Sequence, residues 1–126
     1  MTRRRRFALG VAVVAVVAVT GCADYPKIAC ETFARDRSCP LEGVTAAARP
    51  DLSYYDLTWG KPKPPADIAS DPARVSIWQA EEDRSRATSD SKMTVYLLTG
   101  CKEKHYYSCG RGKSGGFCAQ MAAPVK

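Results

Sequence analysis

Histidine, long apolar runs and a complete phosphate-binding motif are scarce or missing in this sequence. The one histidine, His105, precedes two tyrosines on an expected strand, where a surface role is commoner than general-base catalysis. The apolar run of residues 7–19 has 13 residues, whereas a membrane-spanning helix needs about 20. Residues 112–114 (GKS) lack the glycine that a P-loop carries five positions before its GK pair, where Tyr107 stands. We therefore predict no nucleotide site and no catalytic residues.

Positive charge is scarcer than the net charge of +6 suggests. Four of the 19 Lys and Arg residues are Arg3 to Arg6, so the chain from residue 22 onward carries 15 basic against 13 acidic residues, a net charge of +2. This balance is no electrostatic footprint for nucleic acid, and we expect no such partner. Five basic residues after Gly100 face one acidic residue, Glu103. Such a basic end can contact anionic lipid headgroups or cell-wall polymers, although a solvated surface is the commoner explanation.

The first 22 residues have the order of an export signal. Arg3 to Arg6 precede the apolar run, and the small residues Thr20 and Gly21 follow it up to Cys22. The sequence VTGC at 19–22 resembles the lipobox of bacterial lipoproteins. The resemblance implies cleavage before Cys22 and acyl chains such as palmitate on its sulfur. It makes residues 1–21 a lipoprotein signal peptide and residues 22–27 a tether; a plain secreted protein and an uncleaved anchor are the alternatives.

The same resemblance bears on which membrane holds the chain. In one lipoprotein sorting scheme, an aspartate directly after the lipidated cysteine keeps a protein at the inner membrane. Here that position is Ala23, and Asp24 follows one place later. The outer membrane is therefore favoured if the host has both membranes.

Six cysteines in an exported chain predict disulfide bonds rather than reduced thiols. If Cys22 carries lipid, the remaining five can form two bridges and leave one thiol over; without lipid, all six can pair. The five disulfide candidates are Cys30, Cys39, Cys101, Cys109 and Cys118.

The spacing of the cysteines restricts how they pair. Cys30 and Cys39 are nine positions apart, which places them on opposite sides of a continuous helix, so they should not bridge each other. Cys101 and Cys109 flank an expected hairpin, in which Cys109 should lie opposite residues 95–97. A bridge from Cys39 to Cys101 or to Cys109 would join helix to sheet, and Cys30 or Cys118 would complete the second. Each bridge is expected to close a long loop.

A zinc site is the competing use of these side chains. Cys101, His105, Cys109 and Cys118 offer thiolate and imidazole ligands, which zinc prefers. Their spacings of four, four and nine lack the close cysteine pair of structural zinc sites, and an oxidising compartment favours disulfides. We therefore expect no metal and no cofactor.

Local patterns predict a helix at the start of the domain. At residues 28–38 apolar side chains recur at helical spacing, and Pro40 disfavours helical geometry just before it. A short strand is expected near residues 44–46. The aromatic stretch 52–59 should pack on the core or form an irregular edge strand, and the three prolines of residues 60–65 predict a stiff connector.

The middle of the chain carries conflicting signals. Asp71 before Pro72 indicates the start of a helix, whereas residues 74–78 alternate between polar and apolar as a strand does. We predict a strand over residues 75–79. Residues 81–92 have almost no apolar side chains and predict a mobile surface segment.

The last third of the chain predicts a hairpin. Residues 93–99 are the clearest strand, followed by a turn at 102–104 and a returning strand at 105–109. The glycines of residues 110–116 predict a flexible loop, and Cys118 should fix the tail. Residues 28–126 are therefore predicted to form one small α+β domain, a single N-terminal helix packed on a short antiparallel β-meander.

Two blocks of sequence resemble a group of small exported bacterial proteins. They are residues 33–45 (FARDRSCPLEGVT) and residues 95–101 (VYLLTGC) followed by YSC at 107–109. In that group an F-A…C-P…V segment precedes a V-x-G-C-G…Y-x-C segment; this chain departs from it at Lys102, where glycine is usual, and by the proline-rich insert. The resemblance implies a helix and hairpin pinned by cysteines, and it implies no activity.

Together these patterns predict a lipid-anchored envelope protein with a structural or adaptor role. Its expected partners are the membrane, through lipid on Cys22, and an envelope protein or a cell-wall polymer. The alternative is an inhibitor or immunity-type lipoprotein that acts on an envelope enzyme. A blocker of a basic enzyme should be acidic, and the basic end of this chain disfavours that version.

Overall fold

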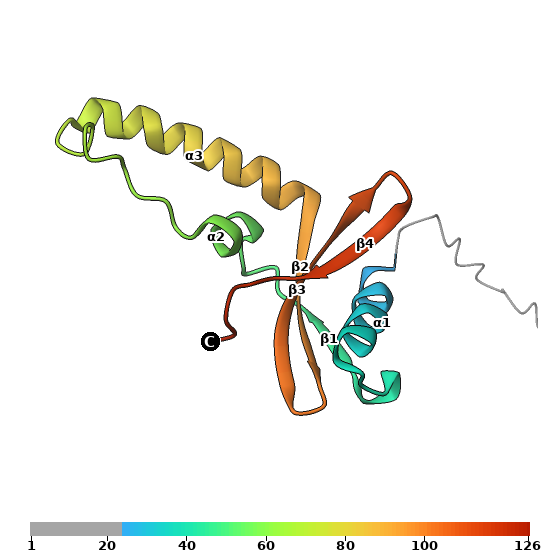
Figure 1. Ribbon diagram of the computed structural model, residues 1–126. Helices are drawn as coiled ribbons and strands as arrows, with labels where there is room; N and C mark the ends of the chain where they lie inside the picture. Colours follow the sequence, from blue (N-terminus) through green and yellow to red (C-terminus); the bar gives the residue numbers. More distant parts are fainter. Residues whose placement is uncertain (1–23) are drawn as a thin grey trace, which may run out of the picture.

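A four-stranded antiparallel sheet lies at the centre of the fold, with its strands in the order β1-β2-β3-β4 (Figure 1). The computed structural model describes residues 24–126. The expected signal peptide 1–21 and the lipidation site Cys22 lie outside the described residues. The strands are β1 (Thr45–Ala48), β2 (Met93–Gly100), β3 (Glu103–Gly112) and β4 (Gly115–Gln120); the helices are α1 (Tyr25–Arg37), the short 3₁₀ helix η1 (Leu41–Gly43), α2 (Tyr54–Trp59) and α3 (Pro72–Lys92). The predicted α+β fold, an N-terminal helix on an antiparallel sheet, is confirmed.

Helix α1 begins and ends where its sequence provides caps. The Asp24 side chain accepts a hydrogen bond from the Lys27 N–H, and Pro26 occupies the first turn, where its missing N–H costs nothing. Ser38 closes the helix in the left-handed conformation at φ 50°. The helix predicted at 28–38 is therefore confirmed, but residues 25–27 are its first turn and not part of a tether.

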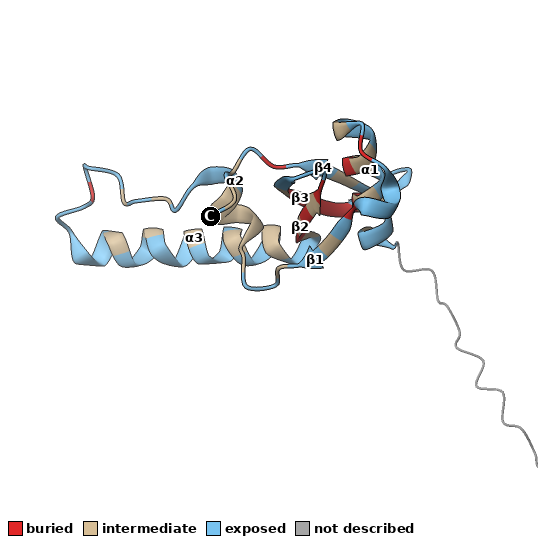
Figure 2. Cartoon of the chain, turned by 90° about the horizontal axis from the view of Figure 1, so that it is seen from below, coloured by how far each residue is buried: buried red, intermediate tan, exposed pale blue. Residues whose placement is uncertain are grey.

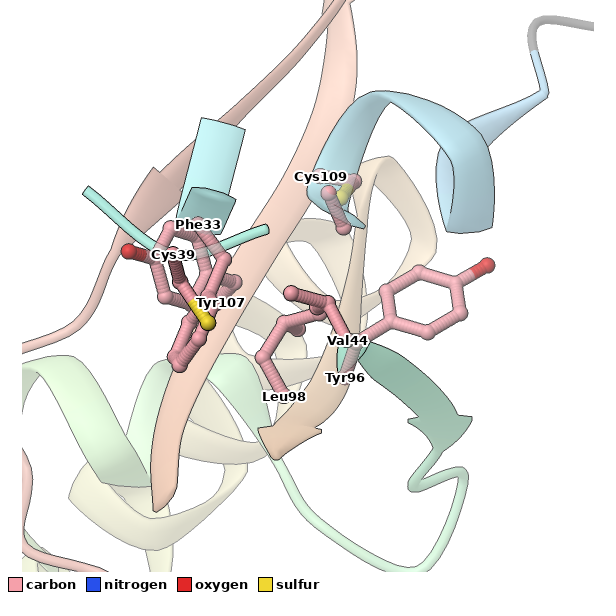
Figure 3. Close-up of a cluster of buried hydrophobic side chains, with 8 residues drawn as sticks. Phe33, Cys39, Val44, Tyr96, Leu98, Tyr107 and Cys109 are labelled. Atoms are coloured by element: carbon pink, nitrogen blue, oxygen red, sulfur yellow. The ribbon is translucent and has the colours of Figure 1, made fainter. Parts of the chain in front are cut away.

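One face of the sheet packs against α1. Neighbouring side chains on a strand point to opposite faces, and Tyr96, Leu98 and Tyr107 point toward the helix. Ala29 and Phe33 of α1 are completely buried in this cluster, and Figure 3 shows Phe33 next to Tyr107. The Phe33 ring meets the Tyr107 ring edge-on at a centroid distance of 5.8 Å. This cluster is the larger part of the core.

The opposite face of the sheet is covered by α2 and the C-terminal tail. Val95, Tyr106 and Met121 are buried there, with Leu57 of α2 and Val125 of the tail packed against them. The aromatic stretch 52–59 therefore packs on the core as one of the two predictions had it. The other, an edge strand, is wrong, because Ser53 accepts a hydrogen bond from the Asp56 N–H and caps a helix.

Helix α3 overturns two predictions. The strand expected at 75–79 and the mobile segment expected at 81–92 are one continuous helix of 21 residues. Its start is the one indicated by the sequence: Asp71 accepts hydrogen bonds from the Ala73 and Arg74 N–H groups, with Pro72 as the first helical residue.

Two tight hairpins connect the last three strands. The β2–β3 turn is made by Cys101 and Lys102 at φ 48° and 62°, one residue earlier than the turn predicted at 102–104. The glycine segment predicted to be a flexible loop is instead paired in β3 and β4, and only Lys113 and Ser114 form its turn. Cys109 lies opposite Thr94, one residue before the predicted range 95–97.

The disulfides confirm part of the predicted pairing. Cys39 is bonded to Cys101 and joins the end of α1 to the β2–β3 turn, as one of the two expected pairings had it. Cys109 is bonded to Cys118, which lies directly opposite it on β4. This bridge spans nine residues and does not close a long loop, contrary to the prediction. Among the cysteines of residues 24–126, Cys30 is the free thiol.

Candidate functional site

The residues considered as zinc ligands are used otherwise. Cys101, Cys109 and Cys118 are all in disulfide bonds, which leaves His105 alone. Between residues 24 and 126 no three His, Cys, Asp or Glu side chains are grouped in a way that could hold a metal ion. The same range contains no helix that is long and apolar enough to cross a membrane.

His105 belongs to a group of polar side chains contributed by β3, β4 and α1. Its Nε2 is 3.6 Å from Glu103 Oε1, and its Nδ1 is 3.3 Å from Gln120 Nε2. Arg37 of α1 donates a hydrogen bond to the Gln120 side-chain oxygen and lies 3.9 Å from Glu103. These contacts join the end of α1 to the sheet, so His105 has a structural explanation that needs no substrate.

Tyr107 and Cys30 are two of the buried or half-buried groups whose pKa the fold shifts. Burial, with the hydrogen bond that the Tyr107 hydroxyl donates to Asp36 Oδ2 at 3.0 Å, raises the pKa of Tyr107 to about 12. Burial and the nearby carboxylates of Asp24 and Glu31 raise the pKa of the Cys30 thiol. A thiol with a raised pKa carries little thiolate, so Cys30 is a weak nucleophile.

The most conspicuous surface feature is the arm formed by α2, the connector and α3, residues 54–92 (Figure 1). Helix α3 runs away from the sheet, and Figure 2 shows most of its surface exposed. No residue of α3 is buried. At 1.5 Å per residue its 21 residues extend about 30 Å, and none of them is buried against the sheet. The helix therefore contributes little to the core.

Side chains of α2 hold the C-terminal half of α3 in place. The Tyr55 hydroxyl donates a hydrogen bond to Glu82 Oε2 at 2.8 Å, and the Tyr55 N–H donates one to Asp90 Oδ1 at 2.9 Å. Arg86 donates to Asp56 Oδ1 at 3.0 Å, and its guanidinium lies 5.7 Å from the centre of the Tyr55 ring. Hydrogen bonds that are part-buried and charge-assisted stabilise more than exposed pairs do. The C-terminal half of α3 is thus held against α2.

The distal half of the arm has few such contacts and carries apolar side chains. Ile68 of the connector is buried, whereas Val75 and Trp78 of α3 are half-buried. Ile77 in this half is 64% exposed, and Trp59, the last residue of α2 at the base of the arm, is 69% exposed. Large apolar side chains exposed on an otherwise polar helix are typical of binding surfaces.

A groove of about 810 Å³ lies beside the base of the arm. Its lining includes Leu52, Leu57 of α2, Tyr106 of β3 and Lys126 of the tail. Arg49 also reaches this groove, but its guanidinium forms two hydrogen bonds with the Asp51 carboxylate, at 2.9 and 2.7 Å, which raise the pKa of Arg49. The groove thus offers apolar area and little uncompensated charge near Arg49.

Comparisons with family models, with curated proteins and with solved structures found no match to this chain. The arm was not predicted from the sequence, because α3 has no buried residue and its sequence therefore shows no apolar periodicity. The signals that could have found it are local ones, the Asp71 cap and the side-chain pairs four residues apart, such as Gln79 with Asp83 at 2.8 Å.

Proposed function

We propose that the mature chain is a lipid-anchored adaptor of the cell envelope that binds another envelope protein through the α2–α3 arm. The anchor is supported by the sequence up to Cys22, and the two disulfides suit an oxidising compartment. The observation that carries the adaptor role is the exposure of Trp59 at the end of α2 and of Ile77 on α3, a helix without a buried residue. No catalytic step is assigned to the chain.

A protein partner fits this surface better than a cell-wall polymer does. Trp is the side chain most enriched among residues that dominate protein–protein binding, and its loss typically costs more than 1 kcal/mol. The arm also carries six basic and seven acidic residues, so it has no net positive charge that would attract a polyanion. A braced helix gives a partner a rigid surface at low ordering cost.

The arm is tested by crosslinking in intact cells and isolation of the lipoprotein with its bound partner. Trp59→Ala combined with Ile77→Ala should abolish recovery of the partner. The matched control is Leu41→Ala, which removes an exposed apolar side chain of η1, 47% exposed and outside the arm. Circular dichroism should show all variants folded, because exposed substitutions change stability by about 0.5 kcal/mol or less.

Equal recovery of the partner with the arm variant and with the Leu41→Ala control would contradict the adaptor role. If the recovered protein is an enzyme that the purified chain inhibits, the inhibitor alternative replaces it. Retention of the chain on isolated cell-wall polymer, unaffected by the Trp59 and Ile77 changes, would instead show that the partner is not a protein.

The anchor is tested separately. Cys22→Ser should stop incorporation of labelled fatty acid and leave the chain unprocessed, and globomycin treatment should also leave it unprocessed. Normal processing after either treatment would exclude a lipoprotein.

A further inference from the structure

The two disulfides differ in how easily solvent reaches them. We call the Cys39–Cys101 bond the turn disulfide and the Cys109–Cys118 bond the hairpin disulfide. Cys101 is exposed in the β2–β3 turn, which projects from one end of the sheet (Figure 1). Cys109 is fully buried and Cys118 is half-buried, and the Tyr25 carbonyl oxygen lies 3.9 Å from the first sulfur and 3.6 Å from the second. A thiol from solution therefore approaches the turn disulfide more easily, on the side of Cys101.

Strained backbone is concentrated at the same bond. Among residues 24–126, three residues other than glycine adopt a positive φ: Ser38 at 50°, Cys101 at 48° and Lys102 at 62°. Ser38 directly precedes Cys39, and the other two residues form the turn itself. This left-handed region crowds a Cβ atom against the following carbonyl oxygen, so it favours glycine. Such strain persists only where the surrounding structure imposes it, and it clusters at functional sites.

The sequence of the turn is unusual for its geometry. A two-residue turn between antiparallel strands takes a positive φ at both central positions, for which Asn-Gly and Asp-Gly are the preferred pairs. Here the central positions are Cys101 and Lys102, enclosed by the paired residues Gly100 and Glu103. The turn disulfide therefore holds a turn that neither of its central residues favours.

The end of α1 is also joined to the sheet by contacts that do not involve the turn disulfide. The Phe33 ring packs against Tyr107, whose hydroxyl donates a hydrogen bond to Asp36 Oδ2 at 3.0 Å. Arg37 donates a hydrogen bond to the side chain of Gln120 on β4. Opening the turn disulfide should therefore release the turn and leave the domain folded.

The free thiol of the described chain is poorly placed to open the turn disulfide. Cys30 lies nine residues before Cys39, about two and a half turns along the helix. Burial and nearby carboxylates raise the pKa of Cys30, so it carries little of the thiolate that attacks a disulfide. A reductant must therefore come from another molecule.

We infer that the turn disulfide is an exchange site for the dithiol of another protein, whereas the hairpin disulfide is structural. A thiolate of that dithiol attacks Cys101 Sγ and forms a mixed disulfide, and Cys39 leaves as a thiolate that takes a proton from water. The second thiol of the dithiol then attacks the mixed disulfide and releases Cys101 as a thiol. The dithiol ends as a disulfide, and this chain has gained two electrons and two protons. Exposed or strained disulfides are the ones that undergo such exchange.

The test uses the protein isolated from its membrane in detergent, without reduction. Free thiols are first blocked with one alkylating reagent, dithiothreitol is added as the dithiol, and a second reagent of different mass labels each thiol as it is released. We expect the cysteines of the turn disulfide to be labelled at least about tenfold faster than those of the hairpin disulfide, because one strained residue stores about the free energy of a tenfold step. Near-ultraviolet circular dichroism should still show a folded domain once the turn disulfide is open.

Two changes at Lys102 separate strain from charge. Lys102→Gly permits the positive φ without crowding, so it should slow the opening of the turn disulfide by up to about tenfold. Lys102→Gln removes the same charge but keeps a side chain at this φ, so it should open at nearly the parent rate. A thioredoxin that retains only its attacking cysteine should form a mixed disulfide with Cys101.

Equal rates for the two disulfides, or earlier opening of the hairpin disulfide, would overturn the inference. Loss of the folded signal together with the turn disulfide would overturn it as well, because the thiols would then report unfolding. Equal rates for Lys102→Gly and Lys102→Gln would contradict the part assigned to the strained turn, and a mixed disulfide at Cys118 would contradict the assigned point of attack. None of these outcomes depends on the lipid anchor or on the α2–α3 arm.

Discussion

Gly100, the last residue of β2, lies where α1 and η1 approach the sheet most closely. A Cβ atom at this position would be 3.0 Å from Phe33 Cε1, 3.1 Å from Val44 Cγ2 and 3.2 Å from the Gly43 carbonyl oxygen. Phe33 cannot withdraw, because it is fully buried with its ring against Tyr107. We therefore expect Gly100→Ala to push α1 and η1 away from the sheet.

The magnitude follows from two opposing terms. Adding a methyl group to a well-packed core typically costs about 1–3 kcal/mol, and three close contacts, one of them with the backbone, place this site at the upper end. Replacing glycine within a strand returns about 0.5–1 kcal/mol. The free energy of unfolding should thus fall by about 2 kcal/mol, which lowers the melting temperature of a domain of this size by about 10 °C.

The assay is thermal unfolding of the oxidised chain, followed by circular dichroism. The matched control is Gly43→Ala, because a Cβ at Gly43 has nothing within 4 Å and should change stability by less than about 1 kcal/mol. If Gly100→Ala melts with the Gly43→Ala variant, the close packing of α1 on the sheet described above is wrong.

Two further predictions concern the disulfides and the buried tyrosine. Alanine in place of both cysteines of the Cys39–Cys101 bridge, which spans 62 residues, should lower the free energy of unfolding by about 1.5 kcal/mol more than the same change at the Cys109–Cys118 bridge, which spans nine. The reason is that closing the longer loop restricts the unfolded chain more. Urea unfolding of the two variants compares these losses, and equal losses would contradict this ranking. The pKa of Tyr107 is raised to about 12, so its contribution to stability is fully present below pH 10 and should be lost as the pH rises from 10 to 12, by up to about 3 kcal/mol. Urea unfolding over this range should show a steeper fall in the free energy of unfolding for the parent chain than for Tyr107→Phe. Parallel falls would refute this prediction.

Elements that bury an apolar face were predictable from the sequence. Helix α1 shows its period because one of its faces, with Ala29 and Phe33, is buried, and β2 is recognised as a continuous apolar run because the sheet is covered on both faces. These elements were placed to within a few residues. The Asp71 cap also indicated a helix start, but the prediction for residues 75–79 was a strand and was wrong.

The prediction for α3 was wrong because contacts with α2 stabilise this helix, and its own sequence does not show them. Val75 and Ile77 alternate by chance, since neither is buried, and the polar residues that follow them lack any apolar stripe. Their helical order depends on contacts with α2, such as Arg86 with Asp56, which lie 30 residues apart. Periodicity cannot report a helix that is held by polar contacts on one side only.

The second hairpin was missed for a different reason. Glycines at 110–116 suggest a flexible loop, yet a Cβ at Gly110 would lie 3.2 Å from the Lys92 carbonyl oxygen and would displace the flexible Met93 side chain, and Gly115 adopts φ 110° at the turn. Once these residues pair, Cys109 and Cys118 face each other and bond. Because a loop was predicted here, the pairing of β3 with β4 was not predicted, and the partner of each cysteine could not be assigned.

The central claim, a disulfide-stapled domain held at the membrane by lipid on Cys22, is tested most directly by the intact mass of the native protein. The protein is isolated from its own membrane and treated with a thiol-alkylating reagent without reduction. We predict a chain that begins at Cys22, carries the mass of its acyl groups, contains two disulfides and takes up one alkyl group at Cys30. A chain without acyl mass, or one in which Cys22 and Cys30 form a third bridge, would contradict it.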